Sequence, residues 1–93
     1  MNELEKYREQ IDKIDKTIAE CFEKRMEVVL QVAEFKQKNG LNTFDPQREQ
    51  KMLDKNQSYI KDEKLKKYYV ELLKKQLEVS KQYQEELKKN IEN

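Results

Sequence analysis

Polar side chains stand in this sequence at positions where an amphipathic helix would carry apolar ones. Between Leu4 and Phe35, apolar residues recur every three or four positions, and Arg25 stands where that series requires an apolar residue. Ser80 and Gln84 interrupt a second apolar series nearer the carboxyl terminus. A charged side chain on a buried helix face is costly unless it is paired with an anion or a ligand. These positions are therefore where we look for chemistry.

Two further cations are placed to join Arg25. Lys36 follows it by eleven residues, so both side chains project from nearly the same helix face, roughly 16 Å apart. Arg48 has the reach to supply a third positive charge, and Asp45 and Glu49 flank it. Each of these residues alone has a structural explanation, such as a snorkelling arginine, a lysine near a helix end, an N-cap or a first-turn acid. Their convergence on one interhelical space favours a binding site.

The residue types favour one class of chemistry. The chain has no histidine and a single cysteine, which removes the usual general base and the usual metal ligand. We therefore expect neither Ser-His nor Cys-His catalysis, and no bound metal. Arginine and lysine in excess suit a polyanionic small molecule. They suit a reaction that needs fixed geometry and electrostatic stabilisation rather than a nucleophile.

Three helices are expected to position these side chains. Gly40 and Pro46 are the only residues of their types, and they are typical of a helix end and a helix start. We expect a first helix at about 3–39, a short second helix at about 46–56 with Asp45 as its N-cap, and a third helix at about 62–91. The predicted fold class is all-α in long-short-long order, and residues 1–93 form one domain.

The apolar faces of the two long helices require a partner. The first helix would be roughly 50 Å long, and a 93-residue monomer cannot bury its whole apolar face. We therefore expect a homodimer in which the long helices of two chains pack together. Arg8 precedes Arg25 by seventeen residues, roughly 25 Å along the helix, so it cannot share a ligand with Arg25 of its own chain. It would enter the partner's site if the first helices are antiparallel.

Composition argues against several other functions. Twenty basic residues balance nineteen acidic ones and the lysine runs are interrupted by glutamates, so no nucleic-acid partner is expected. No apolar run approaches the roughly 20 residues that span a bilayer, and the polar first residues are unlike a signal peptide. Cys21 lies on the apolar stripe and is expected to be a small buried hydrophobe in a reducing compartment. We expect a cytoplasmic protein without a membrane partner.

The whole set of residues resembles the all-helical, AroQ-type chorismate mutases over essentially the entire chain. No single motif is specific, but their combination is: Tyr7-Arg8-x-x-Ile11-Asp12-x-Ile14-Asp15, Lys24-Arg25, Phe35-Lys36, Asp45-x-x-Arg48-Glu49 and Ser80-x-x-x-Gln84. The resemblance implies an intertwined homodimer of six helices with two equivalent active sites. It also implies the Claisen rearrangement of chorismate to prephenate, in phenylalanine and tyrosine biosynthesis. That reaction has no cofactor, no metal and no covalent intermediate.

The resemblance further implies which residues bind the two substrate carboxylates. They are Arg25, Arg48 and Arg8 of the partner chain, with Ser80 assisting. Next to Arg25 the family carries a second arginine, whereas this chain has Lys24 there. The position on the helix face is kept, so we expect the site to be intact.

The resemblance also implies the groups that act at the reacting end of the substrate. Lys36 and Gln84 hydrogen-bond the ether oxygen, Glu49 binds the ring hydroxyl, and Asp45 helps to place it. Together with Arg25, the first three are the expected catalytic residues. The apolar walls that hold the folded substrate are expected to be Val32 and Leu77.

Two alternatives remain open. An isochorismate-pyruvate lyase has the same fold, but that subgroup tends to carry apolar residues where Glu49 and Ser80 stand. A non-enzymatic helical dimerisation module predicts an uninterrupted apolar seam or one polar residue that sets the register. If these 93 residues are the full-length protein, no dehydratase, dehydrogenase or amino-acid-sensing domain is attached, and we expect a monofunctional chain.

Overall fold

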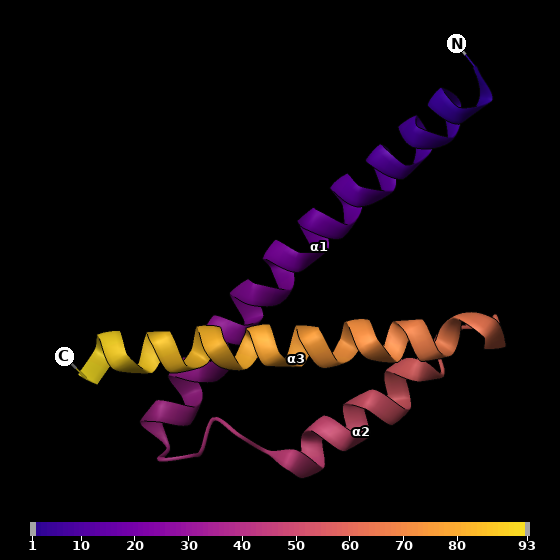
Figure 1. Ribbon diagram of the computed structural model, residues 1–93. Coiled ribbons are helices and arrows are strands. Elements are labelled where there is room, and N and C mark those ends of the chain that lie inside the picture. Colours follow the sequence, from indigo (N-terminus) through magenta and orange to yellow (C-terminus); the bar gives the residue numbers. More distant parts are fainter. Residues whose placement is uncertain (1, 93) are drawn as a thin grey trace.

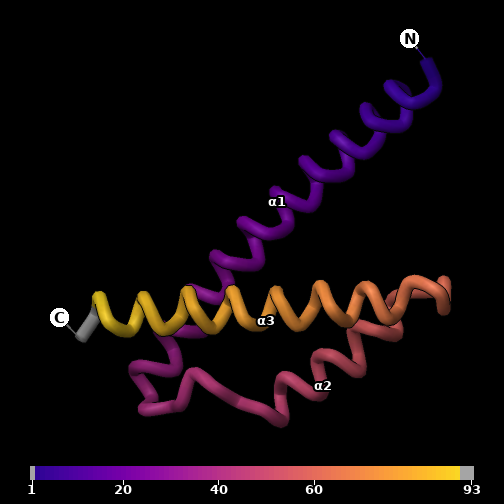
Figure 2. The backbone as a smooth tube through the Cα atoms, in the orientation of Figure 1, coloured from indigo at the N-terminus to yellow at the C-terminus, as the bar shows by residue number. Residues whose placement is uncertain are grey.

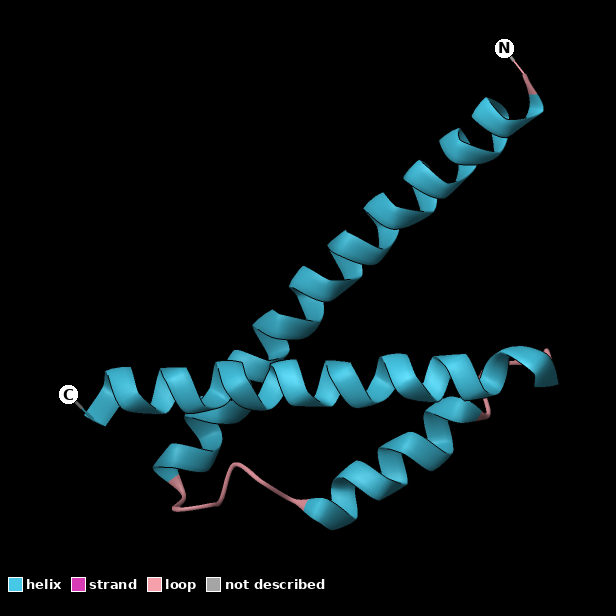
Figure 3. Cartoon of the chain, in the orientation of Figure 1, coloured by secondary structure: helices cyan, strands magenta, loops and turns pink. Residues whose placement is uncertain are grey.

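Three helices make up most of the chain in a computed structural model that describes the backbone of residues 2–92 and the side chains of residues 2–90 (Figure 1). Helix α1 spans Glu3–Lys38, α2 spans Pro46–Gln57 and α3 spans Glu63–Glu92. No strand occurs among the described residues, as the colouring of Figure 3 shows. The fold is all-α in long-short-long order, and the helix bounds differ by no more than one residue from the expected ones.

Local sequence explains where the helices begin and end. The side chain of Asn2 accepts a hydrogen bond from a first-turn backbone N–H of α1 at 2.9 Å. Gly40 follows α1 with a φ of 65°, a left-handed conformation that glycine adopts without strain. Asp45 caps α2 by accepting from the backbone N–H of Arg48 at 3.1 Å, and Pro46 is the first helical residue.

Helix α3 organises the chain, because both α1 and α2 pack against it. It crosses the carboxyl-terminal half of α1, and α2 lies beside its amino-terminal half (Figure 1). The connection at residues 39–45 turns the chain back from α1 toward α2, as the backbone trace of Figure 2 shows. The amino-terminal half of α1 extends away from α2 and α3, and the chain reaches 55 Å in its longest dimension.

The packed interior of a single chain is small. Among the described side chains, the buried ones are Met52, Leu73 and the polar Ser80. The apolar face of α1 from Leu4 to Ile18 is open to solvent, and Ile18 is 60% exposed. Soluble monomers rarely leave so long an apolar face uncovered, and this face is the basis of the dimer proposed below.

Two expectations about the apolar stripe of α1 differ from the structure. Cys21 was expected to be buried and is exposed, because every residue from 2 to 24 is exposed in the single chain. Further along, Val28 and Phe35 of the predicted stripe are exposed as well. A strict seven-residue series (21, 28, 35) drifts by about 20° per heptad around a straight helix, so it leaves the line along which α3 meets α1.

Helix α3 covers a line of α1 side chains that lies beside the predicted apolar stripe. Arg25, Val29, Ala33 and Lys36 are each half-buried there, and they follow the spacing of three and four residues that places side chains one above another. The second apolar series of the sequence, in α3, is expected to continue to Ile91, whose side chain lies outside those that the structure describes. Arg25, the polar residue that interrupts the apolar series of α1, therefore lies on the face of α1 that packs against α3 of the same chain.

Candidate active site

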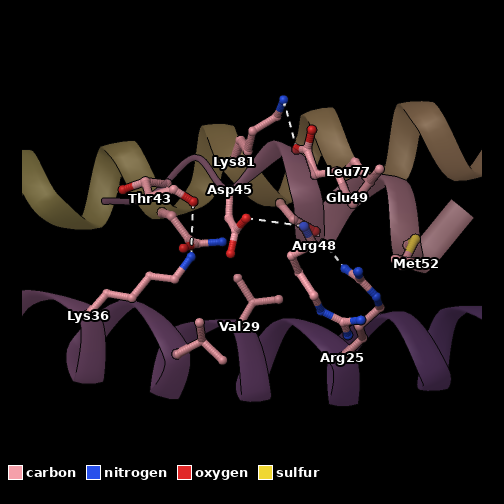
Figure 4. A pocket seen from close by; sticks show the side chains of 13 residues that line it. Arg25, Val29, Lys36, Thr43, Asp45, Arg48, Glu49, Met52, Leu77 and Lys81 are labelled. Carbon is pink, nitrogen blue, oxygen red and sulfur yellow. Dashed lines mark hydrogen bonds and ion pairs between the residues drawn. The ribbon is translucent and has the colours of Figure 1, made fainter. Parts of the chain in front are cut away.

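A pocket of about 170 Å³ opens where the three helices meet (Figure 4). Its walls come from the second half of α1, the connection that precedes α2, the first turns of α2, and the middle of α3. Nine of the predicted site residues line it: Arg25, Val32, Lys36, Asp45, Arg48, Glu49, Leu77, Ser80 and Gln84. The structure thus brings together side chains that are up to 59 positions apart, from 25 to 84, in the sequence.

The pocket carries an excess of positive charge. Four cationic and two carboxylate side chains line it, which leaves a net charge of +2; they are Arg25, Lys36, Arg48 and Lys81, with Asp45 and Glu49. Like charges that are partly shielded from water repel one another more strongly than they do in bulk solvent. A ligand with two negative charges would match this excess.

Ser80 holds Arg25 against α3. Nη1 of Arg25 donates a hydrogen bond to Oγ of Ser80 at 2.6 Å, and Ser80 is only 5% exposed. Burial, and secondly the nearby positive charge of Arg48, lowers the pKa of Arg25 below its ordinary value. Within residues 2–90, none of the ion pairs includes Arg25. The guanidinium is therefore a partly desolvated cation with a neutral acceptor, which is a state that an anionic ligand would relieve.

The connection between α1 and α2 fixes the opposite wall. Nζ of Lys36 donates a hydrogen bond to the backbone carbonyl of Thr43 at 3.0 Å, and Figure 4 shows this side chain rising from α1 toward that loop. Asp45 uses its carboxylate as the N-cap of α2, so the backbone of Arg48 is held while its guanidinium lines the pocket. The ammonium group of Lys36 is thereby attached to the loop, and the Asp45-Pro46 helix start fixes the backbone from which the Arg48 side chain extends.

Helix α3 contributes two further polar side chains to the pocket wall: Lys81, which pairs with a carboxylate of α2, and Gln84, whose amide oxygen has no partner among the described residues. Nζ of Lys81 lies 3.0 Å from Oε1 of Glu49 and 4.7 Å from the centroid of the Phe44 ring. Oε1 of Gln84 is buried and has no hydrogen-bond partner within the described residues. A buried acceptor without a donor costs about 1–3 kcal/mol, so a donor from outside the described residues would stabilise this side chain.

A model of the type II chorismate mutase family matches residues 7–85 of the chain. This match covers most of the sequence and every predicted site residue from Arg8 to Gln84. The chain belongs to the type II chorismate mutase family.

Two curated relatives of this family member are similar to it over part of its length. The T-protein of Enterobacter agglomerans is 43% identical over 51 residues, which are 55% of this chain and 14% of that protein. The T-protein of Haemophilus influenzae is 40% identical over 53 residues, which are 57% of this chain and 14% of that protein. The chain therefore matches only a small part of the length of these relatives. No solved structure matches the chain significantly.

The remaining predicted residue of the family's site lies away from the pocket. Arg8 is exposed on the part of α1 that extends beyond α3, and it does not line the pocket of its own chain. In the described part of the chain, the acidic residues and the cysteine form no cluster of three that would hold a metal ion. None of the helices within residues 2–92 combines the length and apolar character needed to cross a membrane.

Sequence reasoning missed four residues that line the pocket: Val29, Thr43, Met52 and Lys81. Val29 follows Arg25 by four residues, and Lys81 lies four after Leu77 and three before Gln84. Those spacings place each on the same helix face as a predicted site residue, so the signal was present. Thr43 accepts the hydrogen bond of Lys36 through its backbone carbonyl. Because every residue type has this group, the sequence cannot indicate such a contact.

Proposed function

We propose that the chain catalyses the rearrangement of chorismate to prephenate, and is thus an isomerase of aromatic amino acid biosynthesis. The observation that carries the proposal is the convergence of Arg25, Lys36 and Arg48 on one small pocket with net charge +2. Chorismate carries two carboxylates, so its charge is complementary to that excess. The family match over residues 7–85 supports the same reaction.

In this proposal the arginines bind the substrate carboxylates. Arg25 is held by Ser80 at 2.6 Å, so its guanidinium meets the substrate in a fixed orientation. Arg48 supplies the second cation of the same chain, and Arg8 of the partner subunit the third. A guanidinium presents several N–H donors in a planar fork that fits a carboxylate. Fixing both carboxylates selects the folded conformer, which needs no further loss of freedom to react.

Lys36 and Gln84 act on the ether oxygen. Negative charge develops on this oxygen as its bond to the ring carbon breaks. A cation and an amide N–H held beside it therefore stabilise the transition state more than the ground state. The hydrogen bond from Lys36 to Thr43 keeps the ammonium group at the pocket wall before the substrate arrives. For Gln84, the amide would present Nε2 to the ether oxygen.

The remaining groups position the ring. Glu49 accepts a hydrogen bond from the ring hydroxyl, and Asp45 helps to place it from the start of α2. Val32 and Leu77 face the pocket from α1 and α3 and form walls that exclude water from the reacting atoms. All of these steps use groups of the protein, and the reaction as proposed requires no metal or cofactor.

The active enzyme in this proposal is a homodimer. A second groove of about 480 Å³ between α1 and α3 is lined mainly by apolar side chains, including Ile18, Phe22, Leu72 and Val79. It continues into the exposed apolar face of the first half of α1. We assign this continuous surface to a second copy of the chain, whose α1 would bring Arg8 to the pocket.

The direct test is an assay of chorismate consumption, in which the loss of substrate absorbance is measured over time. The wild type should consume chorismate and produce prephenate, and Arg25→Ala should lose most of this activity. Lys24→Ala is the matched control, because this neighbouring lysine is exposed on the same helix and does not line the pocket. A wild type that leaves chorismate unchanged would refute the proposal. Release of pyruvate from isochorismate instead would favour the lyase.

A further inference from the structure

Lys81 is a charged residue of the pocket to which the proposed reaction gives no role. It lines the pocket from α3, and its Nζ lies 3.0 Å from Oε1 of Glu49 on α2. Figure 4 shows the two side chains meeting above the pocket. The other ion pairs of the described chain join residues three apart within α3, so this pair differs in linking two helices.

The surroundings of Lys81 hold its ammonium group in place. Nζ also lies 4.7 Å from the centroid of the Phe44 ring, in the connection that precedes α2. A cation over an aromatic face is attracted by the ring's quadrupole. Contacts with Phe44 and Glu49 thus fix the lysine from two sides. The side chains of Lys81 and Glu49 are 37% and 22% exposed, which places the pair at the rim of the pocket.

The negative charge of Glu49 would oppose the binding of a dianionic ligand, and pairing with Lys81 would remove that opposition. An unpaired carboxylate in the pocket wall would repel both carboxylates of the substrate. In the ion pair, Lys81 offsets that charge and engages Oε1. Oε2 is then the oxygen available to accept a hydrogen bond. A carboxylate neutralised and oriented in this way acts as an acceptor for a hydroxyl group without opposing the binding of an anion.

We propose that Lys81 is a positioning residue for Glu49. It holds Oε1 so that Oε2 faces the ring hydroxyl of the substrate, and Phe44 holds the ammonium group in turn. This inference rests on the proposed function, because it takes chorismate as the ligand. It assigns no direct contact between Lys81 and the substrate.

The role predicts a particular kinetic signature. The contact of Glu49 with the hydroxyl exists before and during the rearrangement, so weakening it should raise KM with little change in kcat. Lys81→Met leaves Glu49 unpaired at the rim, where one added repulsion in a partly screened site corresponds to roughly a tenfold rise in KM. Lys81→Arg retains the charge and should restore most of the affinity.

The experiment is a double-mutant cycle on the dimeric enzyme, with steady-state kinetics on chorismate. The variants are Lys81→Met, Lys81→Arg, Glu49→Gln and the double variant Lys81→Met with Glu49→Gln. Adding Lys81→Met should change KM little once Glu49 is already glutamine, because the lysine acts through that carboxylate. Lys74→Met is the control, since it removes a lysine of α3 that pairs with Glu71 and does not line the pocket.

Several outcomes would overturn the role. Additive effects in the cycle would make Lys81 a direct ligand or a structural residue, and an unchanged KM in Lys81→Met would leave it without a role in binding. Thermal unfolding of each variant shows that kinetics are measured on folded protein, and Lys81→Gln replaces Lys81→Met if the latter does not fold. A wild type without chorismate mutase activity would overturn the proposed function together with this role. An active wild type with an unaffected Lys81→Met overturns the role alone.

Discussion

Arg25→Met should separate the stability of the free protein from its activity. In the free chain Arg25 has a neutral partner, Ser80, and a cationic neighbour, Arg48. Burial and the charge of Arg48 both act against the charged guanidinium, as the direction of its pKa shift indicates. The substitution removes this unfavourable charge together with one hydrogen bond. The linear apolar side chain of methionine fills much of the same space.

The expected change in stability is small. A hydrogen bond that involves a charged group contributes about 1.5–3 kcal/mol, and the loss of the one to Ser80 is offset by relief of desolvation and of repulsion from Arg48. We expect the free energy of unfolding to fall by less than about 1 kcal/mol, because removing a partly buried charge offsets most of the loss of that hydrogen bond. By comparison, Leu73→Ala removes a side chain that is 1% exposed, and such truncations typically cost about 2–5 kcal/mol.

The expected change in activity is large. Removing one partner of a desolvated charge pair costs about 2–4 kcal/mol, which corresponds to a fall in kcat/KM of roughly 30- to 1000-fold. The two quantities are measured on the same samples, by denaturant unfolding and by chorismate consumption. Leu73→Ala is the control with the opposite pattern, since it should lose stability more than activity per folded molecule.

The stability difference between wild type and Arg25→Met should not change with pH in the neutral range. The pKa of Arg25 is lowered in the folded state, so the unfolded chain binds this proton more tightly. The resulting destabilisation is constant below the folded pKa and diminishes only as pH rises through it. Because arginine stays charged throughout the neutral range, the difference between wild type and Arg25→Met should be flat from about pH 6 to 8. A variant as unstable as Leu73→Ala, or one that keeps its activity, would refute the assignment of Arg25 as a ligand-binding cation.

Two other predictions concern catalysis and assembly. Lys36→Ala should lower kcat by about two or more powers of ten, because its contact strengthens in the transition state; steady-state kinetics would contradict this if only KM changed. Mixing inactive Arg8→Ala and Arg25→Ala chains should restore about a quarter of the wild-type activity, because half of the dimers are mixed and each holds one intact site. No recovery after mixing under conditions that exchange subunits would contradict the contribution of Arg8 to the partner's site.

Much of the secondary structure could be predicted because its signals are local. Asp45 and Pro46 begin α2 by capping and by a fixed φ, and Gly40 ends α1 with a positive φ. Each of these effects involves only a few neighbouring residues. The polar misfits were equally readable, since Arg25 and Ser80 interrupt apolar series that a helical period makes visible.

The contacts between helices were less predictable. The apolar stripe of α1 was assigned through Arg25, Val28 and Phe35, whereas α3 covers Arg25 together with Val29 and leaves Val28 and Phe35 exposed. Helical period alone does not decide between neighbouring lines when apolar residues stand on both. The choice depends on which line the connection at residues 39–45 and the crossing of α3 bring into contact. The open line stays available for the second chain that we propose.

The sequence by itself determined the helices, their order and the residue types of a cationic site, because capping, periodicity and charge are properties of short segments. The family resemblance added the expected reaction and the role of each residue. Tertiary structure decided that Arg25 and Ser80 meet at 2.6 Å, that Lys36 reaches the carbonyl of Thr43, and that Lys81 pairs with Glu49. These contacts join segments that are distant in sequence or depend on a loop conformation. Their geometry follows from how whole helices pack, which no local pattern contains.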